Sequence, residues 1–337
     1  MKECYLYKKL KNNDVQCLNC AHYCIVKEGK RGICGTRKNI QGTLYALNYQ
    51  KPCAINIDPI EKKPFFHFLP GTYSLSIATV GCNFRCFNCQ NYDISQGFKN
   101  LEDIPHQEIL PKEIIQIALK EKLPSISYTY TEPAVFSEYA LDIMKLAKKQ
   151  KIKNCWVSNG FWSKELFDEI SPYIDAANID LKSFDENFYV QYCGGRLEPV
   201  LNTLKKIKQK GIWLEVTTLL IPTLNDGDEN LKRIANFIRD SLGSETPWHI
   251  TQFCAAISWK LQDLIDTPVE KLENAYKIGK KVGLKYVYTG NVPGLAREDT
   301  FCPNCKTVCI DRINYIVHRY DKRGKCPKCN TDLNIIE

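Results

Sequence analysis

The sequence lacks the apolar segments that direct a chain into or across a membrane. No run approaches the roughly 18 consecutive apolar residues that a membrane-spanning helix needs. The opening MKECYLYKKLKNN has no apolar core of the kind found in a secretory signal. A GxGxxG after a strand pattern and a P-loop are also missing, so neither standard cradle for nucleotide phosphates is present. We therefore expect a soluble, cytoplasmic protein with no membrane partner.

A strong charge of one sign is missing as well. The chain has 46 lysines and arginines and 38 acidic residues, a net charge of +8, with no polybasic block. Such a mild excess is typical of a solvated surface, so a nucleic-acid partner is not indicated. With 44% apolar residues the chain can bury a core, which excludes global disorder. Its 337 residues correspond to about two average domains.

Cysteine, in contrast, is abundant. The 17 cysteines include four CxxC pairs, where random placement would give on the order of one. These pairs are Cys17/Cys20, Cys86/Cys89, Cys302/Cys305 and Cys326/Cys329. An odd total without a secretory signal argues against a disulfide framework. Clustered thiols in a reducing compartment therefore indicate metal ligands.

Composition divides the chain into four zones. Residues 1–50 form a polar, Cys-rich N-terminal segment, and residues 51–71 form a connector in which four prolines are expected to limit regular structure. Residues 72–295 alternate between strand-like and helix-like patterns. Residues 296–337 form a short, polar segment that carries the last two CxxC pairs.

The alternation within residues 72–295 predicts an α/β fold. The apolar, β-rich runs are Tyr73–Val80, Ser125–Tyr130, Ile152–Ser158, Ala176–Leu181, Ile212–Ile221, His249–Phe253 and Lys285–Thr289. The clearest amphipathic helical patterns are Pro133–Lys149, Asn230–Ile238 and Lys271–Val282. Strands that alternate with helices indicate a parallel sheet, either open or closed into a barrel.

A three-cysteine loop follows the first strand pattern directly. In GCNFRCFNCQNYDISQ, Cys82, Cys86 and Cys89 have the spacing C-x3-C-x2-C. Three thiolates can hold three irons of a cubane cluster and leave the fourth iron open for chemistry. The carboxyl end of a barrel strand is also where such folds carry their active sites. The alternative is a zinc site completed by a distant Cys or His.

These residues resemble the radical S-adenosylmethionine (SAM) superfamily. The resemblance is strongest to the radical SAM component of the AmmeMemoRadiSam system, which is similar to pyruvate formate-lyase activating enzymes. It implies a partial (β/α)6-type TIM barrel of about six strands. A Cys-rich metal-binding segment would precede the barrel and a zinc-ribbon or rubredoxin-like segment would follow it. The stretches that carry the resemblance are DPIEKKPFFHFLPGT, GCNFRCFNCQNYDISQ, YTYTEPAVF, VSNGF, DLKSF, TTLLIPTLND and YVYTGNVPG.

The resemblance implies an enzyme with a 4Fe–4S cluster and SAM as cofactors. In this family the open iron chelates SAM, and one electron cleaves SAM to methionine and a 5′-deoxyadenosyl radical, which abstracts a hydrogen atom from the substrate. Cys82, Cys86 and Cys89 would bind the cluster and be the catalytic residues. The residues expected to bind SAM at the strand ends are Tyr130, Thr131, Glu132, Ser158, Asn159, Asp180 and Lys182.

Several of these positions have a second interpretation or depart from the family. Glu132 can also serve as a helix N-terminal carboxylate. Asp180 and Lys182 are alternate residues on one strand face, where we expect cofactor contact rather than a surface ion pair. Many relatives have Gly-Gly-Glu-Pro where residues 130–133 read Tyr-Thr-Glu-Pro.

Further departures concern the cofactor contacts. Val157 replaces an Asp of the activating enzymes, and Asn88 occupies a loop position that is usually aromatic, with Phe87 one residue earlier. Cys254 stands where relatives often place His. His249, at the start of the same strand, is expected to be a satisfied core residue.

Two more cysteine sets flank the barrel pattern. The N-terminal set consists of Cys17, Cys20, Cys24 and Cys34, which fit a closed zinc site or a second 4Fe–4S cluster. The C-terminal set consists of Cys302, Cys305, Cys326 and Cys329, whose two pairs are spaced as in zinc ribbons. Residues Ile313–Val317 can form the hairpin between these pairs. Zinc is the first expectation for the C-terminal set, and rubredoxin-like iron is the second.

The sequence leaves two other functions open. One is an activase that installs a glycyl radical on a protein, as pyruvate formate-lyase activating enzymes do. The other is a non-catalytic zinc protein that binds nucleic acid. The family implies a protein reductant of the ferredoxin or flavodoxin type, and the branch implies Memo-like and AMMECR1-like companions. No residue pattern indicates the substrate.

Overall fold

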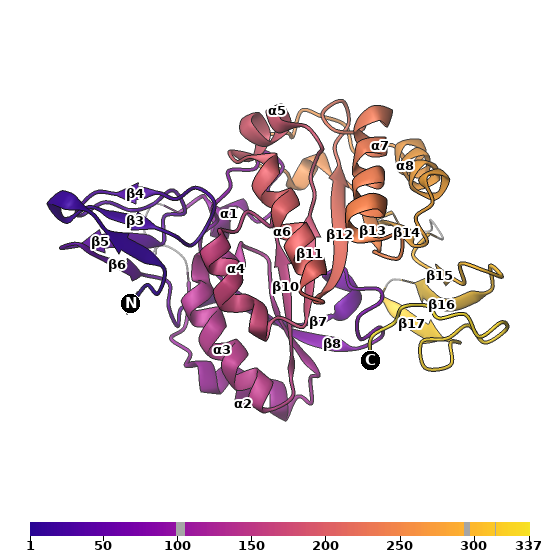
Figure 1. Ribbon diagram of the computed structural model, residues 1–337, viewed down its shortest axis with the longest axis horizontal. Helices are drawn as coiled ribbons and strands as arrows, with labels where there is room; N and C mark the ends of the chain where they lie inside the picture. The colour runs from indigo at the N-terminus through magenta and orange to yellow at the C-terminus, as the bar shows by residue number, and fades with distance from the viewer. Residues whose placement is uncertain (99–104, 293–296, 314) are drawn as a thin grey trace.

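The computed structural model describes residues 1–98, 105–292, 297–313 and 315–337. Its centre is an eight-stranded sheet in the order β14-β13-β12-β11-β10-β9-β8-β7 (Figure 1). Strands β8 to β14 are parallel to their neighbours, and β7 pairs antiparallel with β8. The strands are β7 (Pro52–Pro59), β8 (Tyr73–Thr79), β9 (Ser125–Tyr128), β10 (Lys153–Ser158), β11 (Ala176–Asp180), β12 (Trp213–Leu220), β13 (Trp248–Gln252) and β14 (Val287–Gly290).

Helices cover the outer face of this sheet (Figure 1). They are α2 (Pro111–Lys120), α3 (Ser137–Lys149), α4 (Lys164–Ile170), α6 (Leu197–Gln209), α7 (Asp228–Phe237) and α8 (Val269–Val282). Two short helices, α1 (Tyr92–Ser95) and α5 (Glu186–Phe188), follow the carboxyl ends of β8 and β11. The apolar stripe of each longer helix packs on the strands; in α3, for example, Ile143, Met144 and Ala147 are fully buried. No helix within the described ranges is long and apolar enough to span a membrane.

The partial α/β barrel predicted from the sequence is confirmed. Each of the seven β-rich runs forms a strand of the parallel part, so the sheet has one parallel strand more than the six expected, in addition to β7. The pattern at Pro133–Lys149 divides into a 3-10 turn over Pro133–Phe136 and helix α3. The predicted patterns at Asn230–Ile238 and Lys271–Val282 correspond to α7 and α8, which both begin two residues earlier.

The segment expected to be a connector with little regular structure contains β7. Its prolines lie at the two ends of the strand, Pro52 and Pro59, and β7 is the edge of the sheet, where a missing backbone N–H is tolerated. A 3-10 turn over Ile60–Lys62 follows, and then Phe65 and Phe68, which are almost completely buried. The prediction of an irregular connector was therefore wrong for the first half of this segment.

The N-terminal zone forms two three-stranded antiparallel sheets. Their strands are β1 (Lys2–Glu3), β6 (Thr43–Ala46) and β5 (Arg37–Ile40) in one sheet, and β2 (Tyr7–Lys9), β3 (Val15–Cys17) and β4 (Ile25–Val26) in the other. A buried ion pair holds the zone to α3, because Arg37 donates to both carboxylate oxygens of Glu138 at 2.8 and 2.7 Å.

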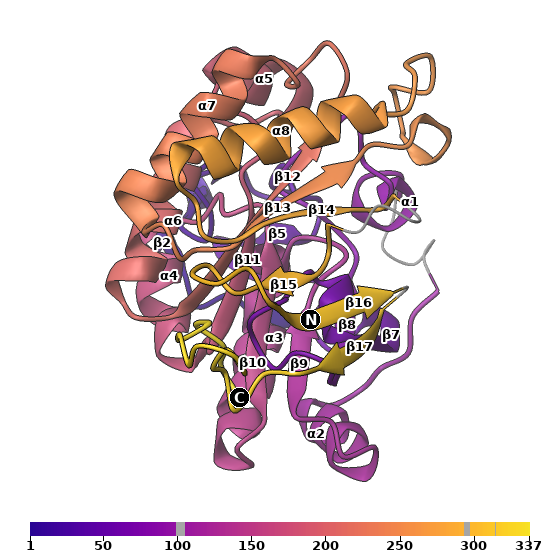
Figure 2. The same ribbon diagram turned by 90° about the vertical axis from the view of Figure 1, so that its right-hand side faces the viewer.

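The C-terminal zone closes the open side of the sheet. Its strands are β15 (Thr300–Phe301), β16 (Val308–Ile313) and β17 (Ile316–Arg319), and β16 and β17 form the expected hairpin. Figure 2 shows these strands between β14 and β7, the two edges of the central sheet. The backbone of Ile336 exchanges hydrogen bonds of 2.8 Å with His67 and Leu69 beyond β7. The expected domain boundary at residues 295 and 296 lies outside the described residues.

Candidate active site

A cavity of about 510 Å³ lies inside the barrel and opens toward the carboxyl ends of the parallel strands. All of the positions expected to bind the cluster or SAM line this one cavity. They are Cys82, Cys86, Cys89, Tyr130, Thr131, Glu132, Ser158, Asn159, Asp180 and Lys182. The topology explains this convergence, because parallel strands bring their carboxyl ends to one edge.

The three cysteines lie on the loop between β8 and α1. Gly81 begins this loop with φ +108°, and a Cβ built there would lie 2.4 Å from Thr36 Cγ2, so the N-terminal zone packs directly on the loop. The sulfurs have polar neighbours: Phe84 N–H donates to Cys82 Sγ at 3.4 Å, and Ser95 Oγ lies 3.2 Å from Cys89 Sγ. Such partners suit thiolates that carry the charge of an iron–sulfur cluster.

Cys86 has a partner that the sequence did not indicate. The thiol of Cys193, fully buried at the end of the helical turn after α5, donates a hydrogen bond to Cys86. This hydrogen bond and nearby Lys182 hold the pKa of Cys86 below its ordinary value despite its burial. The backbone fixes the arrangement, since Arg85 N–H and Phe87 N–H donate to the carbonyls of Cys193 and Tyr192 at 2.7 and 2.9 Å.

Glu132 connects two strand ends. Its carboxylate accepts hydrogen bonds from Ser158 Oγ at 2.7 Å, from the Asn159 backbone N–H at 2.9 Å and from the Ala134 backbone N–H at 3.1 Å. Burial raises the pKa of Glu132 to about 7, and these donors oppose that shift. The bond from Ala134 is the helix N-terminal role foreseen as the alternative, and the carboxylate lines the cavity at the same time.

Tyr130 occupies a backbone conformation that favours glycine. Its φ is +65°, in the left-handed region. The side chain offsets the strain by other contacts: its hydroxyl donates to Asp58, and Lys63 Nζ lies 4.9 Å from the ring centroid. Its carbonyl accepts a hydrogen bond from Asn91 Nδ2 at 2.9 Å, which ties the strand end to the cysteine loop.

Asp180 and Lys182 form an ion pair inside the cavity. Lys182 Nζ lies 2.7 Å from Asp180 Oδ2, with Lys182 mostly buried and Asp180 about one-third exposed. Burial opposes the charge on Lys182, but the attraction of Asp180 and of the Cys86 thiol outweighs it and raises the pKa of the lysine. The pair therefore places fixed positive charge beside the proposed cluster ligands.

The structure places Phe87, Asn88 and His249 as follows. Phe87 is not among the described residues that line the cavity. Its ring packs edge-on against Tyr192 and Trp259, and Lys260 Nζ lies 4.7 Å from the ring centroid. Asn88 does line the cavity. His249 lines it too and donates from Nε2 to Glu215 at 2.6 Å, so it has the buried partner expected of a core histidine.

Sequence reasoning missed one side of the cavity. Residues from the segment 61–66, from β14 and from the C-terminal zone line it, and none was foreseen as a site residue. They are Glu61, Lys62, Lys63, Pro64, Phe66, Tyr288, Thr289, Asn291, Glu298 and Tyr315. The dense charges and aromatic residues of EKKPFF are the signal that could have pointed to this side.

The N-terminal cysteine set faces a second, small cavity of about 20 Å³. Its lining includes Cys17, Cys20, Cys24 and Cys34. Burial raises the pKa of Cys17 to about 12 and also raises that of Cys20 and Cys24, so a metal would have to displace their protons. Asn83, from the loop that carries Cys82, Cys86 and Cys89, lines the same cavity, and its backbone carbonyl accepts a hydrogen bond from His22 Nε2 at 2.8 Å.

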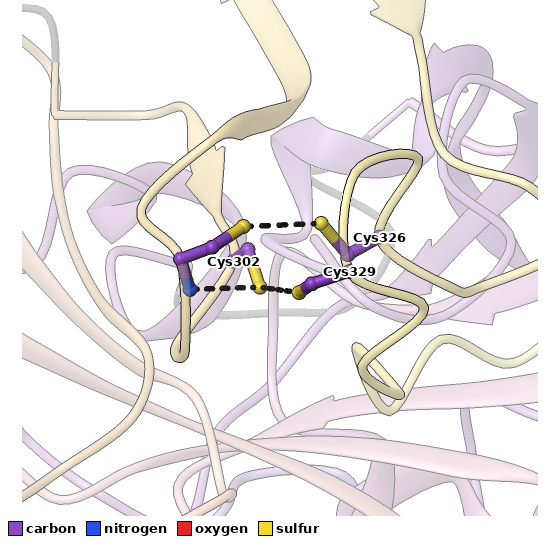
Figure 3. Close-up of side chains that lie close together, drawn as sticks. Cys302, Cys326 and Cys329 are labelled. Carbon is purple, nitrogen blue, oxygen red and sulfur yellow. Dashed lines mark hydrogen bonds between the residues drawn. The ribbon is translucent and has the colours of Figure 1, made fainter.

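The C-terminal quartet is arranged to hold a metal. The sulfurs of Cys302, Cys305, Cys326 and Cys329 all lie within 4.8 Å of one another. The closest pairs, Cys302–Cys329 and Cys305–Cys326, are each 3.5 Å apart, near the roughly 3.8 Å edge of a tetrahedral zinc–thiolate site. Figure 3 shows the side chains of Cys302, Cys326 and Cys329 turned toward one another.

Comparisons with known proteins show the family to which the chain belongs. The model of the radical SAM superfamily matches residues 76–238. An uncharacterized protein of Methanocaldococcus jannaschii is 44% identical over the full length of both chains. The pyruvate formate-lyase-activating enzyme of Clostridium pasteurianum is 24% identical over 60% of this chain and 88% of its own length.

Among solved structures, Streptococcus suis SuiB bound to its precursor peptide SuiA is similar in fold. Its TM-score is 0.50 at 14% identity, and the match covers 69% of this chain and 51% of SuiB. The mostly parallel partial barrel and the family match define the class of the protein, a radical SAM enzyme. The chain belongs to the radical SAM superfamily and is distantly related to pyruvate formate-lyase activating enzymes.

Membership settles the general chemistry. The protein is a radical SAM enzyme, which implies a 4Fe–4S cluster and SAM and argues against the alternative of a non-catalytic zinc protein. The residues present fit these cofactors, because three thiols and a set of polar strand-end groups share one cavity.

Proposed function

We propose that Cys82, Cys86 and Cys89 hold the 4Fe–4S cluster and that the strand-end residues 130–132, 158–159 and 180–182 hold SAM. The observation that carries this proposal is the single cavity of about 510 Å³, which all of these residues line. When bound, the cluster and SAM supply an electron and a carbon radical that can abstract hydrogen from an unactivated C–H bond. The substrate would occupy the remainder of the same cavity.

The chain's own residues orient the cofactors. The Asp180–Lys182 pair offers one anionic and one cationic group to the ammonium and carboxylate of SAM. Glu132 fixes Ser158 and the backbone of Asn159, and Asn159 Nδ2 lies 4.0 Å from Cys82 Sγ.

Anaerobic reconstitution with iron and sulfide, followed by dithionite and SAM, tests this proposal. The parent should release 5′-deoxyadenosine, and Cys82→Ala should release none because its cluster lacks one ligand. Cys53→Ala is the matched control: Cys53 is a half-exposed thiol on β7 that does not line the cavity. If Cys82→Ala and Cys53→Ala behave like the parent, or if no 5′-deoxyadenosine appears, the assignment of the cysteines fails.

Within the superfamily we propose the AmmeMemoRadiSam branch, because the stretches that suggest it extend from the edge-strand segment to β14 and because flanking cysteine sets are present at both ends. The proposal includes a ferredoxin- or flavodoxin-type reductant and Memo-like and AMMECR1-like companions. Co-purification of tagged companions with this chain, with Cys329→Ser as a comparison, would measure whether they bind and whether the C-terminal zone contributes.

A second candidate is a glycyl radical activase, favoured by the similarity to pyruvate formate-lyase activating enzymes over 60% of the chain. Incubating the reconstituted enzyme with a candidate glycyl radical enzyme and SAM distinguishes the two. A glycyl radical signal in electron paramagnetic resonance (EPR) would support the activase, and its absence alongside 5′-deoxyadenosine release would support a different substrate.

We also propose that the N-terminal set binds a second metal centre, either zinc or a 4Fe–4S cluster. All four thiols face one small cavity, and four thiolates suffice for a closed site. The C-terminal quartet would hold zinc, with iron as the alternative. Counting iron, sulfide and zinc per chain in the parent and in one Cys→Ser variant of each set assigns the metals.

A further inference from the structure

One side of the cavity consists of segments that supply none of the proposed cluster or SAM ligands. Glu61 and Phe66 come from the turn after β7, Thr289 from β14, and Glu298 and Tyr315 from the C-terminal zone. Arg312 of β16 holds these segments together: its guanidinium donates to the carbonyls of Phe66 and Glu298 at 2.7 and 2.9 Å. The C-terminal zone is therefore part of the cavity wall.

The base of this wall is a polar network in which hydrogen bonds are satisfied. Glu215 accepts four of them: from the backbone N–H groups of Phe66 and His67 at 3.0 and 2.9 Å, from Trp213 Nε1 at 3.0 Å and from His249 at 2.6 Å. Burial opposes its charge, but the bond from His249 and these other donors hold the pKa of Glu215 well below its usual range. This network needs no ligand.

Two buried groups above this network lack partners. Glu61 is 2% exposed and Thr289 is 1% exposed, and both line the cavity. Glu61 Oε1 accepts from the Gly71 backbone N–H at 2.7 Å, but Glu61 Oε2 and Thr289 Oγ1 have no hydrogen-bond partner among the described residues. Leaving a buried polar atom unsatisfied costs about 1–3 kcal/mol. Two such atoms in one cavity wall indicate a missing ligand.

The charges on this side favour a ligand that donates hydrogen bonds. Burial raises the pKa of Glu61 to about 7, and it raises that of Glu298 as well. The cations nearby are engaged: Lys62 and Lys63 both donate to Asp58, at 2.9 and 2.5 Å. The carboxyl groups of Glu61 and Glu298 both line this side of the cavity, which disfavours an anion.

The nearest cation to Glu61 does not satisfy it. Arg312 Nε lies 3.8 Å from Glu61 Oε1, beyond hydrogen-bond range, and has no hydrogen-bond partner among the described residues. The other guanidinium nitrogens donate to backbone carbonyls and to Thr300 Oγ1. Arg312 does not line the cavity, so its free N–H does not face a ligand there. Phe66 contributes an aromatic wall beside the acceptors, although Arg312 already lies 4.3 Å from its ring centroid. The free acceptor atoms at Glu61 and Thr289 thus remain available to a ligand.

We propose that Glu61 and Thr289 bind a hydrogen-bond donor group of the substrate, an ammonium or a hydroxyl, and so fix the substrate against the wall that the C-terminal zone completes. This inference rests on the proposed function in one respect: it takes the same cavity to hold SAM and substrate. It adds the class of substrate group recognised and the residues that recognise it.

Small probes test the site without knowledge of the substrate. The thermal unfolding midpoint of the metal-loaded protein is measured above pH 7, where Glu61 is ionised, with ethylammonium chloride, ethanol or sodium acetate, and with sodium chloride at matched ionic strength. A probe that binds only the folded chain raises this midpoint by mass action. Ethylammonium or ethanol should raise it in the parent, and Glu61→Gln and Thr289→Val should abolish the shift. The more effective of the two probes identifies the donor.

Matched variants control for fold and charge. Glu121→Gln removes an exposed carboxylate at the end of α2 and should keep the probe shift. Thr218→Val removes a hydroxyl that donates to the Leu181 carbonyl at 2.8 Å, so it should lower the unfolding midpoint. Thr289→Val should not lower the midpoint, because the hydroxyl of Thr289 has no partner among the described residues. A shift with acetate alone, no probe shift in the parent, or an equal shift in Glu61→Gln would overturn the site. Because the readout is unfolding, it is independent of SAM cleavage.

Discussion

At the scale of single residues, the polar groups of the cavity act largely through one another. Glu132 was expected to contact SAM. Its carboxylate accepts hydrogen bonds from Ala134, Ser158 and Asn159, and so it fixes the ends of two strands. Cys86 receives a hydrogen bond from Cys193, which is distant in sequence. Both contacts modify groups that the sequence identified, and neither could be read from spacing alone.

The contact between Cys193 and Cys86 leads to a prediction about the cluster. A hydrogen bond to a cluster-bound sulfur stabilises the more negative, reduced state. Cys193→Ala should therefore lower the reduction potential by roughly 40 mV, the equivalent of about 1 kcal/mol. A redox titration monitored by EPR measures this change. Cys155→Ala, which removes a buried thiol on β10 outside the cavity lining, should leave the potential unaltered, and equal potentials in all three proteins would contradict the role of Cys193.

Glu61 predicts a pH dependence of stability. Burial raises its pKa from 4.5 to about 7, so the folded state holds a proton that the unfolded state has released between these values. The contribution of Glu61 to the free energy of unfolding should then fall by about 3 kcal/mol as pH rises from about 4.5 to 7, and stay constant above. Urea unfolding at several pH values across this range measures the free energy of unfolding. Its decrease with pH should be less steep in Glu61→Gln than in the parent. An unchanged slope in that variant, or a slope equally reduced by Glu121→Gln, would show that Glu61 is not responsible.

At the scale of elements, the parts that the sequence could predict are those with a local pattern. The strand runs of the parallel sheet are apolar and are bounded by turns or helical periods, which is why every one forms a strand. Strand β7 was missed because its interior alternates weakly and two prolines lie at its ends, which suits only an edge strand. Helices α2, α4 and α6 were not identified individually.

The attachment of the N-terminal sheets to α3 gives a prediction at this scale. Arg37→Met leaves Glu138 buried without its cation and should lower the free energy of unfolding by about 3–5 kcal/mol. The double variant Arg37→Met/Glu138→Leu should recover much of this loss, because no unpaired charge remains. Chemical denaturation measures all three proteins.

The comparison for this ion pair is an exposed one. Lys164 and Asp168 are 2.6 Å apart on the surface of α4, and Lys164→Met should change stability by less than about 1 kcal/mol. If Arg37→Met has an equally small effect, the buried pair does not anchor the N-terminal zone.

At the scale of the whole molecule, one cysteine set lies on a loop of the barrel, and the other two lie in the N- and C-terminal zones that pack against the barrel. Their spacing identified all three in the sequence, but not their relation to the cavity. The C-terminal zone forms a wall of the cavity through Arg312, which reaches Phe66 across 246 positions of sequence. Such long-range contacts depend on the assembled tertiary structure, since no local pattern encodes which surface Arg312 meets. The fold was therefore largely predictable, while the side of the cavity formed by residues 61–66, β14 and the C-terminal zone was not.

The N-terminal set has the most direct relation to the catalytic loop. Its cavity is lined by Asn83, which lies between Cys82 and Cys86, and His22 donates to the Asn83 carbonyl at 2.8 Å. Asn159 Nδ2 in turn donates to Asn83 Oδ1 at 2.8 Å. A metal bound at the N-terminal set would therefore hold the backbone of the catalytic loop in place.

Loss of the N-terminal metal should then change the EPR spectrum of the cluster proposed at Cys82, Cys86 and Cys89. Cys20→Ser should reduce the metal content of its own site and also alter the EPR line shape of the reduced catalytic cluster, because Asn83 loses a fixed neighbour. Cys305→Ser should lower only the metal of the C-terminal quartet and leave that line shape intact, since Cys305 faces the cysteines of its own set. The opposite result would contradict this prediction. If the EPR line shape changes in Cys305→Ser and not in Cys20→Ser, the C-terminal zone, and not the N-terminal metal, supports the loop.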